Sequence, residues 1–236
     1  MRELLRHIPS PIKNLIKRGT AIFTWDPWFQ KSWSQEGEDR VLERFFGRQT
    51  SGFYVDVGAH HPKRFSNTFA LYRIGWSGIN IDPMPGSMKL FHKHRPRDIN
   101  LEIGIAKDEG KLEYFIFNEP ALNGFNGVLS QDRHTTDSKY KIQEVKEIPV
   151  RPLSEVLDEQ VPSGTDIELM SIDVEGLDLE VLQSHDWEKY PPTLVLVEIL
   201  KSSMHELFNS DVNRFMEKNG YRIYAKCVNT VFFLRE

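Results

Sequence analysis

The sequence predicts an α/β protein with a doubly wound, mostly parallel sheet that ends in an antiparallel hairpin. Short apolar runs, typical of buried strands, alternate along the chain with segments of helical pattern. The last two apolar runs follow each other across a tight turn instead of a helix. The chain has 236 residues, of which 39% are hydrophobic, and this is enough for the core of one such domain.

The first half of the chain alternates helix and strand. Ser34 is placed to cap a helix that continues to Phe46, with acidic residues in its first turn. Residues 53–57 form an apolar run that stops at a glycine, which is typical of a buried parallel strand. The next elements that we expect are a helix over 66–73, a strand over 79–82, a helix over 87–94, and strands over 99–105 and 112–117.

The second half begins with a polar segment and then resumes the alternation. Residues 118–139 contain Gly and Asn and are expected to form a long loop, which could cover an acceptor as a lid. Residues 221–228 and 230–234 are expected to form a hairpin around Asn229. Between these segments we expect a helix over 153–157, a strand over 167–173, a helix over 177–183, a strand over 193–199 and a helix over 204–218.

Charge and cysteine content exclude several classes of protein. The formal net charge is −4, so no overall basic field favours nucleic acid. The single cysteine, Cys227, cannot form a disulfide framework within one chain and fits a reducing compartment. No apolar run is long enough for a membrane span or a signal peptide, so we expect a cytoplasmic protein.

The N-terminal segment, residues 1–33, is set apart from the expected domain, residues 34–236. Basic and apolar residues are interleaved in it, and aromatic residues follow. Such a segment could lie on an anionic membrane surface or contact a partner protein. The interpretation that we favour is a helix and loop that pack on the domain, and Pro9 and Pro11 limit any helix at its start.

Acidic residues stand at four of the expected strand ends. They are Asp56, Asp82, Asp173 and Glu198. In an open parallel sheet, ligands bind at the carboxyl ends of the strands. A carboxylate next to a buried strand is costly unless it has a partner, so these four acids predict a binding site at this edge.

The turn after the first strand favours an adenosyl ligand over a dinucleotide. The residues from Asp56 to Ala59 lack the glycine triplet of dinucleotide-binding folds, which argues against a nicotinamide or sugar-nucleotide enzyme. Gly58 lets a ligand approach the backbone, and Asp56 could orient an ammonium group. Asp82, at the tip of the second strand, is placed to bind two ribose hydroxyls. S-adenosylmethionine presents such a ribose without a phosphate.

Several blocks of the sequence, spread in order over residues 34–236, resemble the FkbM-type methyltransferases. The blocks are residues 34–39, 54–62, 65–68, 75–83, 95–98, 171–176 and 197–198. The resemblance implies a class I, Rossmann-like methyltransferase fold, S-adenosylmethionine as methyl donor, and O-methylation, often of sugars or secondary metabolites.

The resemblance also implies roles for individual residues. Asp56, Gly58 and Ala59 match the donor loop, and Asp82 matches the ribose-binding acid. His61 and Pro62 stand where many class I enzymes have a further glycine, which leaves the path of this loop open. From the same blocks, the remaining residues that we expect to bind the cofactor are Gln35, His60 and Asn67.

The expected catalytic residues are acids at adjacent strand ends and one histidine. Asp173, Glu175 and Glu198 could act as base, acceptor clamp or ligands of a hard cation, with Mg²⁺ or Mn²⁺ held by Asp173 and Glu198. Alternatively, Glu175 caps the turn at Gly176 and Glu198 forms a structural ion pair. His205 is a further expected catalytic residue, since it follows the strand that ends at Glu198, and His60 is a competing base.

The sequence therefore predicts an O-methyltransferase that acts on a hydroxyl of a small acceptor, with a sugar or glycan among the options. Arg95 and Arg97 could bind an anionic group of the acceptor or form surface ion pairs. Two alternatives stay open. One is a nucleotide-sugar or NAD-dependent α/β enzyme, and the other is a noncatalytic methyltransferase-like domain that recruits a partner or a membrane.

Overall fold

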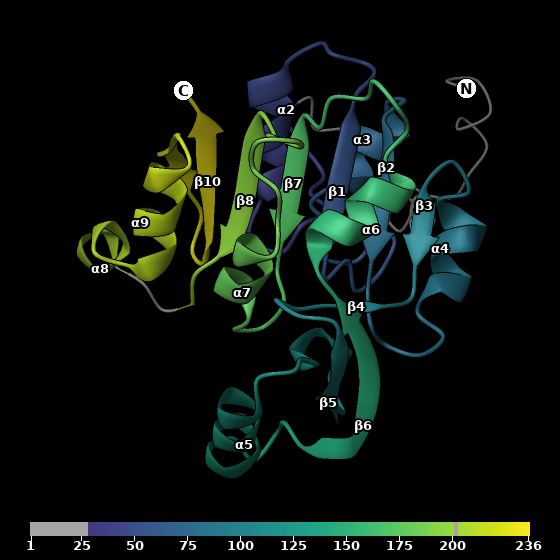
Figure 1. Ribbon diagram of the computed structural model, residues 1–236, viewed down its shortest axis with the longest axis vertical. Helices are drawn as coiled ribbons and strands as arrows, with labels where there is room; N and C mark the ends of the chain where they lie inside the picture. The colour runs from purple at the N-terminus through teal and green to yellow at the C-terminus, as the bar shows by residue number, and fades with distance from the viewer. Residues whose placement is uncertain (1–27, 201–202) are drawn as a thin grey trace, which may run out of the picture. The chain divides into compact units, whose positions relative to one another are not determined.

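A computed structural model describes residues 28–200 and 203–236 (Figure 1). Residues 32–236 form one compact unit. The first 27 residues, and with them most of the predicted N-terminal extension over residues 1–33, lie outside the described residues. In the described part of the chain, no helix has both the length and the apolar character needed to cross a membrane.

The described residues contain a seven-stranded central sheet in the order β3-β2-β1-β7-β8-β10-β9. The pairs formed by β1, β2, β3, β7 and β8 are parallel, whereas β10 is antiparallel to both of its neighbours. The predicted fold class, a doubly wound sheet with an antiparallel C-terminal hairpin, is confirmed. The strands are β1 (Phe53–Val57), β2 (Ser77–Ile81), β3 (Ile99–Leu101), β7 (Leu169–Ile172), β8 (Leu194–Glu198), β9 (Tyr221–Lys226) and β10 (Thr230–Arg235).

The middle strands form because their residues are apolar on both faces. Every residue of β1 and of β7 is buried, as is usual for parallel strands that are covered by helices on both sides. Val55 and Val57 point to one core, whereas Tyr54 points to the other. Asp56 and Ser171 are the polar exceptions in these two strands, and both lie near their carboxyl ends.

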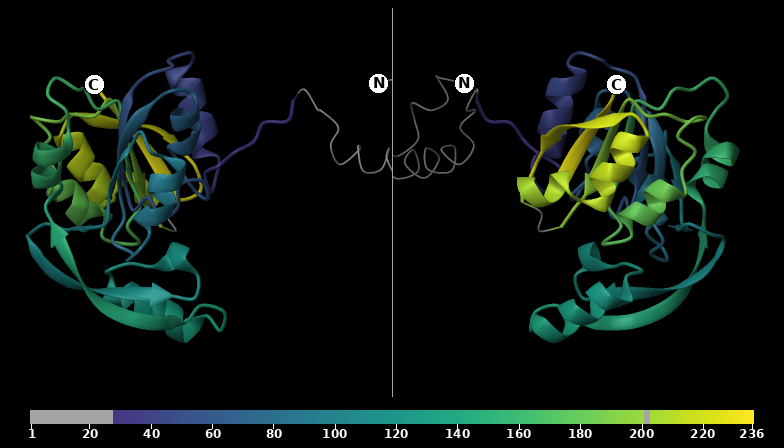
Figure 2. Two further views of the ribbon diagram at one scale, coloured as in Figure 1. Left: turned by 90° about the vertical axis from the view of Figure 1, so that its right-hand side faces the viewer. Right: turned by 60° about the vertical axis from the view of Figure 1, so that its left-hand side comes forward.

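Helices cover both faces of the central sheet, as the edge-on view in Figure 2 shows. On one face, α2 (Glu38–Phe46) and α3 (Phe69–Arg73) contribute to the core that contains Tyr54. On the other face, α6 (Leu153–Gln160), α7 (Asp178–Gln183) and α9 (Asp211–Lys218) contribute to the core that contains Val55. Two further helices are α4 (Met88–His94) and α8 (Met204–Phe208).

Within the compact unit, residues 104–151, here called the insertion, form a smaller substructure at the carboxyl ends of the parallel strands (Figure 1), and the rest of the unit is here called the central unit. Its three-stranded sheet has the order β4-β6-β5, in which β6 is antiparallel to β5 and parallel to β4. Its elements are β4 (Gly104–Ile105), β5 (Gly110–Phe117), the 3₁₀ helix η2 (Pro120–Leu122), α5 (Gly127–Thr136) and β6 (Ile142–Arg151).

The predicted loop over residues 118–139 is wrong, because this segment contains η2 and α5. Asn126 starts α5 by accepting a hydrogen bond from the backbone N–H of Leu129. The sequence of this helix has no apolar face that would predict it, since Ser130 is its one buried residue. The strand β6 has no counterpart among the predicted elements. Only Ile148 and Val150 are buried in it, and its charged residues interrupt the alternation of apolar and polar residues that is typical of a strand.

Several predicted boundaries also differ from the structure. The predicted strand over 99–105 is two strands, β3 and β4, which belong to different sheets. The predicted helix over 204–218 is two helices. The first, α8, ends at Phe208, and the Ser210 hydroxyl caps the second, α9, by accepting the N–H of Asn213. The helix expected from Ser34 begins at Glu38, and the Ser34 hydroxyl accepts the N–H of Asp39 instead.

Candidate functional site

A cavity lies between the carboxyl ends of the parallel strands and the insertion. It contains about 700 Å³ of space outside protein atoms, open solvent at its mouth included. The central unit contributes residues that follow β1, β2 and β7, among them Gly58, Asp82 and Asp173. The insertion contributes Tyr114, Pro120, Ala121, Asn123, Gly124 and Phe125.

The turn after β1 is a backbone cradle that only glycine can form. Gly58 has φ 82°, and a Cβ atom there would lie 1.7 Å from the carbonyl oxygen of Asp173. The N–H groups of Gly58 and Ala59 both donate to the carbonyl of Ile81, at 2.9 and 3.0 Å. The turn is thereby held against β2 and brought close to the loop after β7.

Asp82 lies where a ribose-binding acid is expected. Its side chain is almost fully buried, and its two oxygens accept the backbone N–H groups of His60 and Met84, each at 2.9 Å. Burial raises the pKa of Asp82 to about 6, although these hydrogen bonds lower it. A carboxylate has about four lone-pair positions. Asp82 therefore keeps acceptor capacity for two hydroxyl groups of a ligand.

Three residues on the cavity wall have left-handed backbone conformations. Among the described residues other than glycine, positive φ angles occur at His60, Phe65 and Glu175, and all three line the cavity. Such conformations cost free energy for residues with a side chain and concentrate at functional sites. This concentration supports the cavity as the functional site independently of its charges.

His60 presents a neutral imidazole on the cavity wall. Burial, together with the nearby Arg64 and His61, lowers the pKa of His60 to about 4. Within the described residues, its buried Nε2 atom has no hydrogen-bond partner. The ring lies nearly parallel to that of Phe65, with 6.4 Å between the ring centroids. His60 can therefore donate or accept a hydrogen bond without adding charge near neutral pH.

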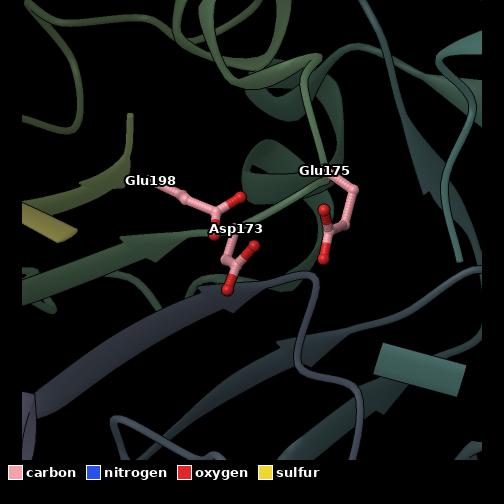
Figure 3. Close-up of side chains that lie close together, drawn as sticks. All are labelled: Asp173, Glu175 and Glu198. Carbon is pink, nitrogen blue, oxygen red and sulfur yellow. The ribbon is translucent and has the colours of Figure 1, made fainter. Parts of the chain in front are cut away.

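Three carboxylates meet at the ends of β7 and β8 (Figure 3). One ligand oxygen from each of Asp173, Glu175 and Glu198 lies within 4.8 Å of the other two. Asp173 has an open surface toward the cavity, although protein surrounds it elsewhere. Desolvation and the neighbouring carboxylates raise the pKa of Asp173 well above its usual value, and the same causes raise the pKa of Glu198 to about 8. These three acids are here called the acid cluster, and Glu198, with a pKa of about 8, holds a proton at neutral pH.

The loop after β7 is held in place by Asp178, a residue that the sequence did not single out. The Asp178 carboxylate accepts the N–H groups of Val174 and Gly176, at 3.2 and 3.1 Å. Burial raises its pKa to about 7. Its position in the first turn of α7, just after the loop, is a signal that could have identified it.

Asp56 is turned away from the cavity into a buried polar network. Its Oδ2 accepts the hydroxyl of Thr68 at 2.6 Å, and that hydroxyl also accepts Arg95 Nη2 at 2.9 Å. Arg95 Nε donates to Asp98 at 2.7 Å, and neither side chain of this pair is exposed. The predicted role of Asp56 in orienting an ammonium group is not tested, but the structure shows what holds Asp56 in place.

Arg95 and Arg97 do not form the surface ion pairs that were considered for them. Arg95 is fully buried, so it is neither a surface residue nor open to an acceptor. Arg97 donates to the backbone carbonyls of Tyr72 and Trp76, instead of forming a surface ion pair. Both arginines therefore connect elements of the fold.

Gln35 lies on the cavity wall, and hydrogen bonds of the neighbouring residues Glu36 and Glu38 hold its segment in place. Glu36 accepts both the backbone and the side-chain N–H of Asn229, at 2.7 and 3.1 Å, and Glu38 accepts the hydroxyl of Thr230 at 2.7 Å. The block over residues 34–39 thus attaches the start of α2 to the turn between β9 and β10, next to the end of β8.

The remaining predicted residues are placed less directly at the site. Asn67 donates to the hydroxyl of Ser171 at 3.1 Å, beside the end of β7, but does not line the cavity. Ala59 is buried with Met88 and Phe91 of α4. His205 lies exposed on α8 and is not among the lining residues. The insertion residues Tyr114, Asn123 and Phe125 were missed, because nothing in the sequence links them to the strand ends.

Strand order and site together define the class of this protein. A mostly parallel sheet with the reversed strand β10 between β8 and β9 is the arrangement of the class I, Rossmann-like methyltransferase fold. The profile of the family described as "Methyltransferase FkbM domain" matches residues 56–223. The chain belongs to this family, and it is an S-adenosylmethionine-dependent methyltransferase.

Comparison with solved structures gives a distant likeness. The crystal structure of a TehB-like SAM-dependent methyltransferase from Corynebacterium glutamicum matches with a TM-score of 0.39 and 11% sequence identity, over 97% of this chain and 100% of that chain. Likeness at this level carries no weight for function. No curated protein gives a significant match.

Proposed function

We propose that this protein transfers the methyl group of S-adenosylmethionine to a hydroxyl of a sugar or another small metabolite. The supporting observation is the acid cluster beside the glycine cradle. A hydroxyl must lose its proton on methylation, and carboxylates with raised pKa values suit proton removal near neutral pH. An amine acceptor would need no such group once it is neutral.

The cavity residues fit the donor. Gly58 leaves room for a ligand against the backbone, Asp82 has free acceptor capacity for ribose hydroxyls, and Ile103 and Ile105 supply an apolar wall for a base. When bound, S-adenosylmethionine supplies an electrophilic methyl group on a sulfonium. The chain itself binds and orients the two reactants, and the acceptor's proton passes to a carboxylate of the acid cluster.

The proposal divides the site into a donor side and an acceptor side. Asp82→Ala should weaken binding of S-adenosylhomocysteine, because it removes the partner of the ribose. Glu175→Ala should lower turnover while leaving S-adenosylhomocysteine affinity nearly unchanged. Calorimetry measures the affinities. An equal loss of affinity in both variants would contradict this division.

The acceptor class is tested with a labelled donor. Donor with a trideuterated methyl group is incubated with a panel of glycosides and hydroxylated metabolites, and the products are analysed by mass spectrometry with fragmentation. The proposal expects the label on an oxygen, in amounts that fall with Asp82→Ala. Label on nitrogen or carbon alone would show a different acceptor chemistry.

A metal ion at Asp173 and Glu198 is a separate proposal. Carboxylate oxygens are the ligands that Mg²⁺ and Mn²⁺ prefer, and the acid cluster supplies them within 4.8 Å of one another. Dialysis against EDTA followed by addition of Mg²⁺ or Mn²⁺ tests it, since a required metal would restore lost activity.

A cytoplasmic location also belongs to the proposal, on the basis of the single cysteine.

A further inference from the structure

An ion pair joins the insertion to the acid cluster. Nη2 of Arg133, on α5, lies 2.6 Å from Oε2 of Glu175, and only 18% and 13% of the two side chains are exposed. Among the ion pairs of the described residues, this is the one that reaches the acid cluster. A charged pair so far removed from water is costly to form, and breaking one partner leaves the other uncompensated.

The insertion also contacts the loop after β7 at two further points. Asn126 Nδ2 donates to the carbonyl of Gly176 at 3.1 Å. Gly124 packs so closely that a Cβ atom there would lie 3.1 Å from Cβ of Glu175. The left-handed conformations of Glu175 and Gly176, at φ 56° and 96°, are therefore held by the insertion on one side and by Asp178 on the other.

The charges around the cavity give this contact a consequence beyond attachment. Three carboxylates lie close together, and the Arg133 guanidinium opposes the rise in the pKa of Glu175 and of Glu198. Glu175 lines the same cavity as Gly58 and Asp82. The charge on the acceptor side of the cavity thus depends on a residue that the central sheet does not supply.

We propose that Arg133 is a positioning residue, which holds the Glu175 carboxylate at the cavity wall and sets the net charge of the cavity in which donor and acceptor meet. This inference rests on the proposed donor site. It differs from a purely structural role, in which the ion pair would only attach the insertion to the central unit.

The charge at the site can be measured without knowing the acceptor. S-adenosylmethionine carries a positive sulfonium, whereas S-adenosylhomocysteine has a neutral thioether at the same position. The ratio of their dissociation constants therefore reports the charge near the donor sulfur. A unit charge about 10 Å away, at an effective dielectric constant between those of protein and water, changes this ratio by about fivefold. Calorimetry on the full chain in EDTA at pH 9, one unit above the pKa of about 8 for Glu198, gives both constants.

Four variants separate charge positioning from attachment. Arg133→Gln should shift preference about fivefold toward S-adenosylmethionine, and Glu175→Gln should shift it by a similar factor in the opposite direction. The double variant should return near the ratio of the unaltered chain, and Arg133→Lys should preserve that ratio. Lys146→Gln, which removes an exposed positive charge of the insertion outside the cavity, is the matched control and should change nothing.

The outcomes distinguish this inference from the proposed donor site. A ratio that stays within about twofold in Arg133→Gln, while both affinities or the melting temperature fall, would show that Arg133 only attaches the insertion. If Arg133→Gln does not fold, the comparison is between Glu175→Gln and the double variant Arg133→Gln/Glu175→Gln. The double variant should prefer S-adenosylmethionine more strongly than Glu175→Gln does. Equal preference in the two would overturn the proposed role of Arg133. Failure of the unaltered chain to bind either ligand would instead refute the donor site, and with it the role of Arg133.

Discussion

The central sheet and the insertion meet at the same cavity, but apolar burial stabilises the first whereas polar contacts and few buried residues stabilise the second. The strands β1 and β7 are buried along their whole length, whereas β6 buries only Ile148 and Val150 among its ten residues. The acid Asp82 and the cradle at Gly58 come from the central sheet, and Arg133 comes from the insertion. The central sheet supplies the proposed donor side by close packing. The insertion completes the proposed acceptor side through a few polar contacts.

The same contrast appears in the ion pairs of the two regions. Arg95 and Asp98 form a fully buried pair in the central unit, while Lys146 and Glu144 on β6 form a pair with 41% and 54% of their side chains exposed. A buried pair is costly to break because the remaining charge has no water around it. An exposed pair contributes little, because water and salt screen it.

The largest effect is expected from Arg95→Met, which should lower the free energy of unfolding by about 3–5 kcal/mol. The variant leaves Asp98 buried without its cation and removes the hydrogen bond that orients Thr68 toward Asp56. Urea unfolding monitored by circular dichroism measures the change. A loss below about 1 kcal/mol would show that this network does not hold the central unit together.

Gly58→Ala should reduce S-adenosylhomocysteine affinity by at least about 100-fold. The added Cβ would collide with the carbonyl of Asp173, and φ 82° is strained for alanine, which together cost about 3 kcal/mol. Gly164→Ala is the matched control, since Gly164 has φ 76° with open space around it. Calorimetry on both variants separates collision from backbone strain. Similar affinities in the two would refute the cradle.

The pH dependence of donor affinity should follow Asp82. The ionised carboxylate accepts hydroxyl groups, and its pKa in the ligand-free protein is raised to about 6. Affinity for S-adenosylhomocysteine should therefore be constant above pH 7 and fall by about tenfold per unit below pH 6. Asp82→Asn should bind more weakly and show no such decline. A flat profile in the unaltered chain would contradict the role of Asp82.

The contribution of Asp82 to the free energy of unfolding should change with pH in the opposite direction to its contribution to donor affinity. The pKa of Asp82 is about 6 in the folded protein and about 4 in an unfolded chain. Its contribution to stability is thus complete below pH 4 and is lost as pH rises through 6. Bound donor should offset this loss, so thermal stabilisation by S-adenosylhomocysteine should be larger at pH 7.5 than at pH 5.

The smallest effect is expected from Lys146→Gln in the insertion, within about 0.5 kcal/mol in the free energy of unfolding. Lys146 pairs only with the exposed Glu144 among the recorded ion pairs of the described residues. The same urea experiment measures it. A loss close to that of Arg95→Met would erase the contrast between the two regions.

The central unit could be predicted from the sequence, because its strands are short apolar runs that end in acids. Asp82, Asp173 and Glu198 lie at the carboxyl ends of β2, β7 and β8, where the sequence placed them. The buried pair of Arg95 and Asp98 was not predicted, since charged residues three positions apart are typical of a surface. Their burial depends on Tyr54 and Thr68, which are distant in the sequence.

The insertion could not be predicted to the same degree. The helix α5 begins with a glycine and contains two threonines near its end, and it buries one residue. Long-range pairing with β5, rather than local pattern, determines β6. The contact between Arg133 and Glu175 follows from these elements, so no signal in the sequence could connect the two residues.

Calorimetric titration of the full chain with S-adenosylmethionine, S-adenosylhomocysteine and NAD tests the donor site most directly. The geometry at Gly58 and Asp82 predicts that both adenosyl ligands bind at one site, that Asp82→Ala weakens both, and that NAD does not bind. Binding of NAD with no binding of either adenosyl ligand would contradict the donor site.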